Sequence, residues 1–252
     1  MRITVLGKSP SWPDAGGACS GYLIEDDDTC LLVDCGSGVL ARLRAIRDYD
    51  RVDGVVVSHM HADHFFDLVP YACALSYGPR AHAVIPQLLL PPGGRDVLRA
   101  ITSAGGQEDL VATAFRAREY DVAESERVGS LRLRFQPVPH FVPANAVEVS
   151  SDDGGGRFTF GADHGPSEAL CVFAAGTDLL MLEATLTEPE PEGRRGHLTP
   201  AEAGEHATRC DAARLVLTHL SDELDADWAL AEARRTYAGP VELAHAGAEY
   251  AV

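Results

Sequence analysis

Long apolar runs, paired cysteines and basic residues are scarce in this chain of 252 residues. No stretch approaches the roughly 20 apolar residues that a membrane-spanning helix needs, and the apolar segment after Met1 is too short for a signal peptide. The six cysteines include no Cys-x-x-Cys pair, so the sequence indicates neither a disulfide framework nor a thiolate zinc site. We therefore expect a cytoplasmic protein that does not contact a membrane.

The balance of charge is strongly acidic. Lys and Arg number 21 against 38 Asp and Glu, the net charge is −17, and Lys8 is the one lysine. Affinity for long nucleic acids depends on neutralising many phosphates with basic side chains, so a function that coats DNA or RNA is disfavoured. A small anionic substrate held by a local cation remains compatible with this composition, and we expect a small-molecule substrate.

Short apolar, β-rich segments alternate with helical patterns in both halves of the chain. We predict strands at 3–6, 22–24, 31–33, 55–57, 131–136, 147–149, 157–160, 179–182, 215–217 and 241–243. We predict helices at 39–47, 66–77, 200–210 and 225–235, with Thr199 as the N-cap of the third. This order favours an α/β fold, an αββα sandwich of two mixed sheets with helices outside. The absence of a long linker favours a single domain, 1–252, with two pseudo-symmetric halves.

A dense group of potential metal ligands follows the apolar strand at 55–57. It comprises His59, His61, Asp63 and His64, four donors in six residues. Alternate residues of an extended segment share a face, so His59 and His61 can serve one ion. Asp63 and His64 begin the next helix and can serve a neighbouring ion. The motif alone therefore predicts two metals.

Three further donors each lie just beyond the end of a predicted strand. His140 follows 131–136, Asp163 follows 157–160 and His219 follows 215–217. If these strand ends converge, the three side chains complete the ligand set of a binuclear site. Imidazoles and carboxylates without thiolates suit Zn²⁺, Mn²⁺ or Fe²⁺. We expect two divalent ions, with zinc as the first choice.

The motif HMHADH with the three later donors, in this order, resembles the metallo-β-lactamase superfamily over essentially the whole chain. Leu32-Val-Asp34-Cys-Gly36 is similar to its strand–Asp–Gly motif. Within the superfamily, the chain is most similar to the small YhfI-like bacterial hydrolases and the actinobacterial cyclic-nucleotide phosphodiesterases, a group that resembles RNase Z. The segments that carry this narrower resemblance are 31–40, 196–199, 215–220 and 243–245.

The resemblance implies a division of the ligands between two metals. The first metal would take His59, His61 and His140, the second would take Asp63, His64 and His219, and Asp163 would bridge them. His61 stands where the oxygen-reducing diiron branch has Glu, and Asp163 stands where the main β-lactamase subclass has Cys. The first difference favours hydrolysis over redox chemistry, and the second disfavours the main β-lactamase subclass. The resemblance also favours a homodimer.

The mechanism that we expect uses a hydroxide between the two metals as the nucleophile. A leaving alkoxide needs a proton, and a histidine is a natural donor. His197 matches the leaving-group histidine of the phosphodiesterase branch, so we take His197, together with Asp63, as the catalytic candidates. We expect Asp34 to accept a hydrogen bond from a ligand imidazole or to fix the HMHADH loop. His164 stands where the family more often has Thr or Ser, and it could change the hydrogen bonding there, contact substrate or be inert.

The function that we favour is hydrolysis of a small phosphodiester such as a cyclic nucleotide. An acyl hydrolase (lactonase, thioesterase or esterase) would use the same metal centre. RNase Z activity is less favoured because 88–119 lacks a basic arm, and a non-catalytic metal-binding module is disfavoured because every ligand position is filled. Substrate-binding residues stay unassigned, with Arg80, Arg194 and Arg195 as candidate phosphate contacts. We interpret the acidic run 188–192 as a solvated loop.

Overall fold

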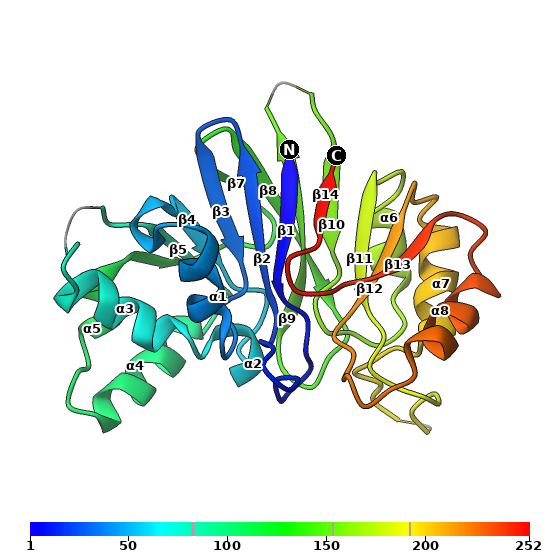
Figure 1. The fold of residues 1–252 in the computed structure, drawn as a ribbon, viewed down its shortest axis with the longest axis horizontal. Coiled ribbons are helices and arrows are strands. Elements are labelled where there is room, and N and C mark those ends of the chain that lie inside the picture. Colours follow the sequence, from blue (N-terminus) through cyan, green and yellow to red (C-terminus); the bar gives the residue numbers. More distant parts are fainter. Residues whose placement is uncertain (82–83, 153, 192) are drawn as a thin grey trace.

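Two mixed β-sheets pack face to face with helices on both outer sides (Figure 1). The computed structural model describes residues 1–81, 84–152, 154–191 and 193–252, and each sheet has seven strands within these residues. The predicted αββα sandwich is therefore confirmed.

The first sheet has the order β14-β1-β2-β3-β4-β5-β6. Its first strands are antiparallel, whereas β3 to β6 run parallel. Its members are β1 (Arg2–Gly7), β2 (Gly21–Asp26), β3 (Thr29–Val33), β4 (Gly54–Val56), β5 (Gln87–Leu90), β6 (Arg116–Glu119) and β14 (Glu249–Ala251).

The second sheet has the order β13-β12-β11-β10-β9-β8-β7. It repeats the same design, because β7 to β10 are antiparallel neighbours and β10 to β13 are parallel. Its members are β7 (Glu126–Val128), β8 (Leu131–Val138), β9 (Ala144–Ser151), β10 (Arg157–Phe160), β11 (Leu179–Glu183), β12 (Leu215–Thr218) and β13 (Val241–Leu243).

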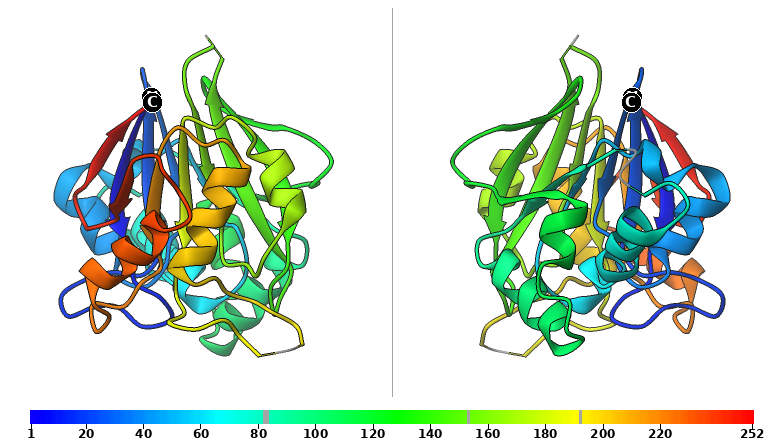
Figure 2. Two further views of the ribbon diagram at one scale, coloured as in Figure 1. Left: turned by 90° about the vertical axis from the view of Figure 1, so that its right-hand side faces the viewer. Right: turned by 90° about the vertical axis from the view of Figure 1, so that its left-hand side faces the viewer.

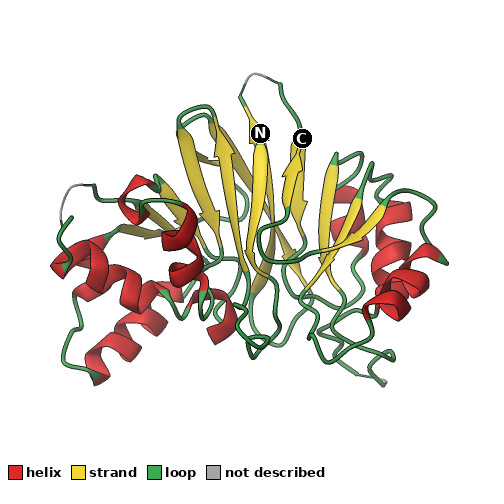
Figure 3. Cartoon of the chain, viewed as in Figure 1, coloured by secondary structure: helices red, strands yellow, loops and turns green. Residues whose placement is uncertain are grey.

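The helices form two separate outer layers, which Figures 2 and 3 show from other directions and by element type. Those of the first half are α1 (Val39–Ile46), the 3-10 helix η1 (Tyr49–Arg51), α2 (Ala62–Phe65), α3 (Leu68–Tyr77), α4 (Gly94–Ala104) and α5 (Leu110–Ala114). Those of the second half are α6 (Glu168–Phe173), α7 (Pro200–Arg209) and α8 (Ala226–Arg234). In the described part of the chain, none of them is long and apolar enough to cross a membrane.

Three buried apolar clusters account for the layers. The central one joins the inner faces of the two sheets, with Ile24 and Val33 on one side and Val149 and Phe158 on the other. The two outer clusters lie under the helices, one around Leu43 and the other around residues of α6, α7 and α8. Burial of apolar surface is the main favourable contribution to folding, so each sheet is stabilised on both faces.

Several local predictions are confirmed, and one helix differs. Thr199 caps α7, where its side chain accepts a hydrogen bond from the backbone N–H of Glu202 and the Glu202 side chain bonds back to Thr199. The helix expected at 66–77 begins two residues later, as α3 (Leu68–Tyr77), and the short helix α2 (Ala62–Phe65) precedes it. Asp67 lies at the break, where its backbone N–H donates to Cys35 and its carboxylate accepts from the N–H of Leu40.

Candidate metal centre

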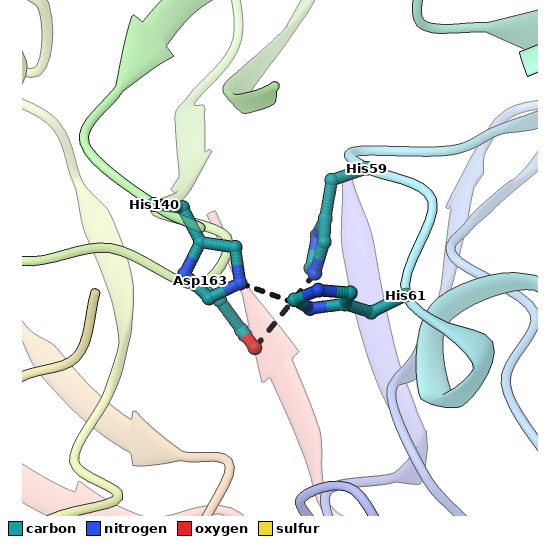
Figure 4. Close-up of side chains that lie close together, drawn as sticks. All are labelled: His59, His61, His140 and Asp163. Carbon is teal, nitrogen blue, oxygen red and sulfur yellow. Dashed lines mark hydrogen bonds and ion pairs between the residues drawn. The ribbon is translucent and has the colours of Figure 1, made fainter. Parts of the chain in front are cut away.

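The loops that follow β4, β8, β10 and β12 meet at one end of the two sheets, close to α2 at the lower edge of Figure 1. They bring the seven predicted ligands into two groups, and within each group the ligand atoms lie within 4.8 Å of one another. Asp163 belongs to both groups. The other members are His59, His61 and His140 in the first group, and Asp63, His64 and His219 in the second. Figure 4 shows the first group converging.

Donor atoms of this cluster are buried without a hydrogen-bond partner. Among the residues that the structure describes, His59 Nε2, His64 Nε2 and Asp163 Oδ1 are in this state. His140 Nε2 and His61 Nδ1 face each other at 3.0 Å. Buried polar atoms are normally hydrogen-bonded, so atoms of this kind call for another partner. Inward-facing imidazole nitrogens and carboxylate oxygens fit divalent metal ions.

The loop that carries His59 to His64 is held between both sheets. His59 forms a β-bridge with Ala144 at the start of β9, and the backbone N–H of Asn145 donates to the Ser58 carbonyl at 3.2 Å. On the other side, the backbone of Gly36 lies against the loop, and a Cβ there would lie 1.8 Å from the carbonyl oxygen of Asp63. Glycine at 36 is therefore needed for this close approach.

Asp34 fixes the orientation of His64. Its Oδ2 accepts a hydrogen bond from His64 Nδ1 at 2.6 Å, and the same carboxylate accepts from the backbone N–H and hydroxyl of Ser58 at 2.7 and 2.8 Å. His64 Nε2 is thereby left facing the donor cluster. This is the contact that the sequence predicted for Asp34.

The second half orients its histidines in the same way. His140 Nδ1 donates to the carbonyl of Gly196 at 2.8 Å, and His219 Nδ1 contacts the hydroxyl of Thr185 at 2.8 Å. Both leave Nε2 facing the cluster. His219 and Ala162, the residue before Asp163, have left-handed backbone angles (φ 55° and 57°). Such strain is uncommon outside glycine and concentrates at functional sites.

The pKa shifts of most of these groups favour the protonation state that binds metal. Burial lowers the pKa of His59, His61 and His140, so their rings are neutral. Burial acts to raise the pKa of Asp163, but the neighbouring His219 and His64 hold it well below its ordinary value. Neutral imidazole and ionised carboxylate are the forms that bind metal.

His64 is the exception. Burial alone would lower the pKa of His64, but the carboxylates of Asp163 and Asp34 raise it well above its ordinary value. Metals bind the neutral imidazole, so a divalent ion at Nε2 would compete with a proton there.

His197 lies beside the donor cluster and is held by Glu183. Its Nδ1 donates to Glu183 Oε1 at 2.8 Å, and its ring centroid lies 5.0 Å from that of His140 and 5.9 Å from that of His219. Burial opposes protonation, but the hydrogen bond and charge of Glu183 raise the pKa of His197 to about 9. Glu183, His197 and His219 also form a third group with metal-binding potential.

The site residues predicted from the sequence did not include Glu183. It ends β11, is fully buried, and its carboxylate also accepts from the backbone N–H of His164 at 2.8 Å and the hydroxyl of Thr185 at 2.6 Å. The signal was an acidic residue directly after the apolar run 179–182, the same pattern that marked Asp34.

The interpretation of 188–192 as a solvated loop is wrong for Glu190. Its carboxylate accepts hydrogen bonds from the backbone N–H groups of Gly196 at 2.6 Å and His197 at 3.2 Å. It therefore ties the acidic run to the segment that supports His140 and carries His197. Glu192 lies outside the described residues.

His164 does not reach the surface. Its ring is fully buried, Nδ1 bonds to the carbonyl of Gly165 at 2.8 Å, and burial lowers its pKa to about 4. A direct contact between this side chain and substrate is therefore disfavoured.

The three arginines proposed as phosphate contacts differ in their surroundings. Arg80 pairs with Asp48 and Asp50, and Arg195 forms a two-pronged contact with Glu202 at 2.6 and 2.9 Å. Arg194 is exposed, and no ion pair is found for it within the described part of the chain. Of the three, Arg194 has the charge most available for substrate.

Fold and donor set together define a metal-binding αββα sandwich. The chain belongs to the β-lactamase superfamily, because the family model described as "Beta-lactamase superfamily domain" matches residues 29–220.

Known relatives match along nearly their whole length. The chain is 30% identical to "Probable metallo-hydrolase YhfI" of Bacillus subtilis, with 98% of each chain covered. The crystal structure of that YhfI superposes with a TM-score of 0.88 at 27% identity, covering 99% of this chain and 98% of the other. "Ribonuclease Z" of Myxococcus xanthus is 28% identical, with 98% of this chain and 96% of the other covered. The YhfI and RNase Z likeness expected from the sequence is thus confirmed, whereas a specific likeness to cyclic-nucleotide phosphodiesterases stays a prediction.

Proposed function

We propose that this chain is a metal-dependent hydrolase that cleaves a small phosphodiester, for example a cyclic nucleotide. Two divalent ions, when bound, would supply activation of a water molecule and neutralise charge on the phosphoryl oxygens. Zinc is the ion that we propose, since the donors are imidazoles and carboxylates. The two ligand sets that we propose are His59, His61 and His140, and Asp63, His64 and His219, with Asp163 shared.

The observation that carries the proposal is the Glu183–His197 pair beside the ligand cluster. An alkoxide leaving group is strongly basic and needs a proton as its bond breaks. With its pKa raised to about 9, His197 carries that proton at neutral pH. Glu183 holds Nδ1, so Nε2 is free to donate it. A weakly basic leaving group, such as the thiolate of a thioester or an aryl oxide, has less need of such a residue, whereas lactones and alkyl esters share this need with phosphodiesters.

Two further observations support a small phosphodiester. A relative named Ribonuclease Z favours phosphodiester chemistry. The net charge of −17 disfavours a long polyanion as substrate. A short substrate needs few cationic contacts beyond the metal centre, and Arg194 is available for one of them.

The test compares substrates on zinc- and manganese-loaded protein. Cyclic mononucleotides, cyclic dinucleotides and bis(p-nitrophenyl) phosphate represent phosphodiesters, and a p-nitrophenyl ester, a thioester and a lactone represent acyl substrates. We expect turnover of at least one natural phosphodiester to exceed that of every acyl substrate. Turnover of acyl substrates alone would contradict the proposal and favour the acyl hydrolase.

Transfer RNA provides a separate arm of the same test. We expect no gel shift with tRNA at physiological salt, because the chain has a net charge of −17 and 88–119 contains no lysine. Tight binding together with removal of the tRNA 3′ trailer would contradict the proposal of a small substrate and would favour tRNA as the substrate.

A further inference from the structure

An exposed aromatic ring adjoins the candidate metal centre. Phe141 directly follows His140 in the loop between β8 and β9, and its side chain is 46% exposed. Its ring centroid lies 5.3 Å from that of His140 and 5.9 Å from that of His197. Isolated apolar side chains on a surface are ordinary. Phe141 is different because it touches both a proposed ligand and the proposed proton donor.

The ring is held in place by a glycine. It lies so close to Gly196 that a Cβ there would be 2.4 Å from a ring carbon. Gly196 is itself fixed, since its carbonyl accepts from His140 and its N–H donates to Glu190. The ring therefore lies against the fixed backbone of Gly196 and the rings of His140 and His197, and 46% of the residue stays exposed to solvent.

A fixed, exposed ring of this kind suits a flat partner. Nucleobases stack on aromatic side chains with little dependence on sequence, because every base has a π-face. His140 and His197 neighbour both the ring and the site proposed for the phosphoryl group. A substrate that carries a base and a phosphodiester in one small molecule can occupy both at once.

We propose that Phe141 is a specificity-determining residue that stacks on the nucleobase of the substrate while the phosphodiester lies in the metal centre. This inference rests on the proposed function and narrows it to nucleotide phosphodiesters. The ring contributes to binding of the base and takes no part in bond breaking.

Phe141→Leu tests this role because it keeps an apolar side chain and removes the flat face. Phe141→Trp retains stacking, and Phe66→Leu is the matched control. Phe66 is another half-exposed phenylalanine (45%), and its ring packs on Phe65.

The first readout is direct binding to the metal-loaded protein. The probe is 2-aminopurine riboside monophosphate, whose fluorescence is quenched when its base stacks. We expect quenching with wild type, Phe141→Trp and Phe66→Leu, and its loss in Phe141→Leu. Ribose 5-phosphate, which has no base, should bind wild type and Phe141→Leu equally.

The second readout separates KM from kcat. For cyclic AMP, we expect Phe141→Leu to raise KM about tenfold with kcat unchanged, within the range that base stacking supplies. The base-free methyl riboside cyclic phosphate should show no change. Unaltered KM and quenching in Phe141→Leu, or equal losses in Phe66→Leu, would overturn the proposal. A wild-type protein that cleaves none of the phosphodiesters named above would instead overturn the proposed function, and this inference with it.

Discussion

The two sheets contribute to the candidate site in different ways. The first sheet supplies four donors in one short segment, from the loop after β4 into α2, and Asp34 holds that segment through Ser58 and His64. The second sheet supplies one donor after each of three strands, and the same half of the chain carries Glu183, His197 and Phe141 beside the cluster. The first half therefore concentrates its candidate ligands, whereas the second half disperses them among several loops.

Contiguous ligands and dispersed ligands leave different parts of the chain available for other roles. Contiguous ligands give one half a local framework that depends on few distant contacts. Dispersed ligands in the other half leave room between them for His197, the proposed proton donor, and for Phe141, the ring that we propose stacks on the substrate. Catalytic and binding residues are commonly found on loops that a rigid scaffold positions.

The largest effect should follow from breaking the connection between the halves. Asp163→Asn removes the charge that both donor groups share, so we expect it to lower metal content from two ions per chain and to reduce turnover by more than about 100-fold. Loss of even an outer hydrogen-bond partner of a ligand costs about 10- to 100-fold. Elemental analysis and steady-state kinetics measure both effects. Asp28→Asn, an exposed aspartate in a turn, is the control, and full metal content in Asp163→Asn would refute the shared role.

The next prediction affects the second half alone. His197→Ala should lower kcat by roughly 10²- to 10⁴-fold for substrates with an alkoxide leaving group, because it removes a general acid. Metal content should stay unchanged, and p-nitrophenyl phosphodiesters should lose much less because their leaving group needs little help. His245→Ala replaces an exposed histidine and serves as control. Equal losses for both kinds of leaving group would argue against proton donation.

The third prediction affects the first half alone. Asp34→Asn replaces the carboxylate that orients His64, and we expect metal affinity to fall by about 10- to 100-fold. Titration with a competing chelator measures this affinity. At saturating metal, turnover should recover toward wild type, in contrast to His197→Ala. Failure to recover would mean that Asp34 acts in the reaction itself.

The smallest effect should come from Glu190. Glu190→Ala removes the acceptor for the backbone N–H groups of Gly196 and His197. We expect kcat to fall about tenfold, which is the scale of one hydrogen bond to a charged group. Glu190→Gln keeps an oxygen at this position and should retain most of the activity. Wild-type turnover in Glu190→Ala would show that the segment holds its position without this contact.

Much of the fold could be predicted from the sequence because its strands are apolar and because α7 and α8 begin at side-chain caps, Thr199 and Asp225. The region 87–119 was missed, since β5 and β6 have four residues each and α4 begins at Gly94 after a left-handed Gly93. Short strands and glycine-led helices give weak local signals. The pairing of β5 with β4, and of β6 with β5, comes from tertiary packing.

The candidate site likewise contains residues that the sequence reveals and residues that only the fold reveals. The HMHADH loop is visible in six consecutive residues, and His140, Asp163 and His219 could be anticipated from their places after strands. Glu183 also follows an apolar run, as Asp34 does, but the sequence does not show the contacts that Glu183 and Glu190 make. Their roles depend on which backbone and imidazole groups the fold brings near them, and a run of Pro and Glu has the composition of a solvated loop.

The central claim is that both halves build one binuclear centre, and anomalous diffraction from zinc-loaded crystals tests it most directly. We predict two zinc peaks, one among His59, His61 and His140, the other among Asp63, His64 and His219, with Asp163 in contact with both. A peak at Glu183, His197 and His219 in place of either of these would contradict the account, because His197 would then be a ligand and no longer a proton donor.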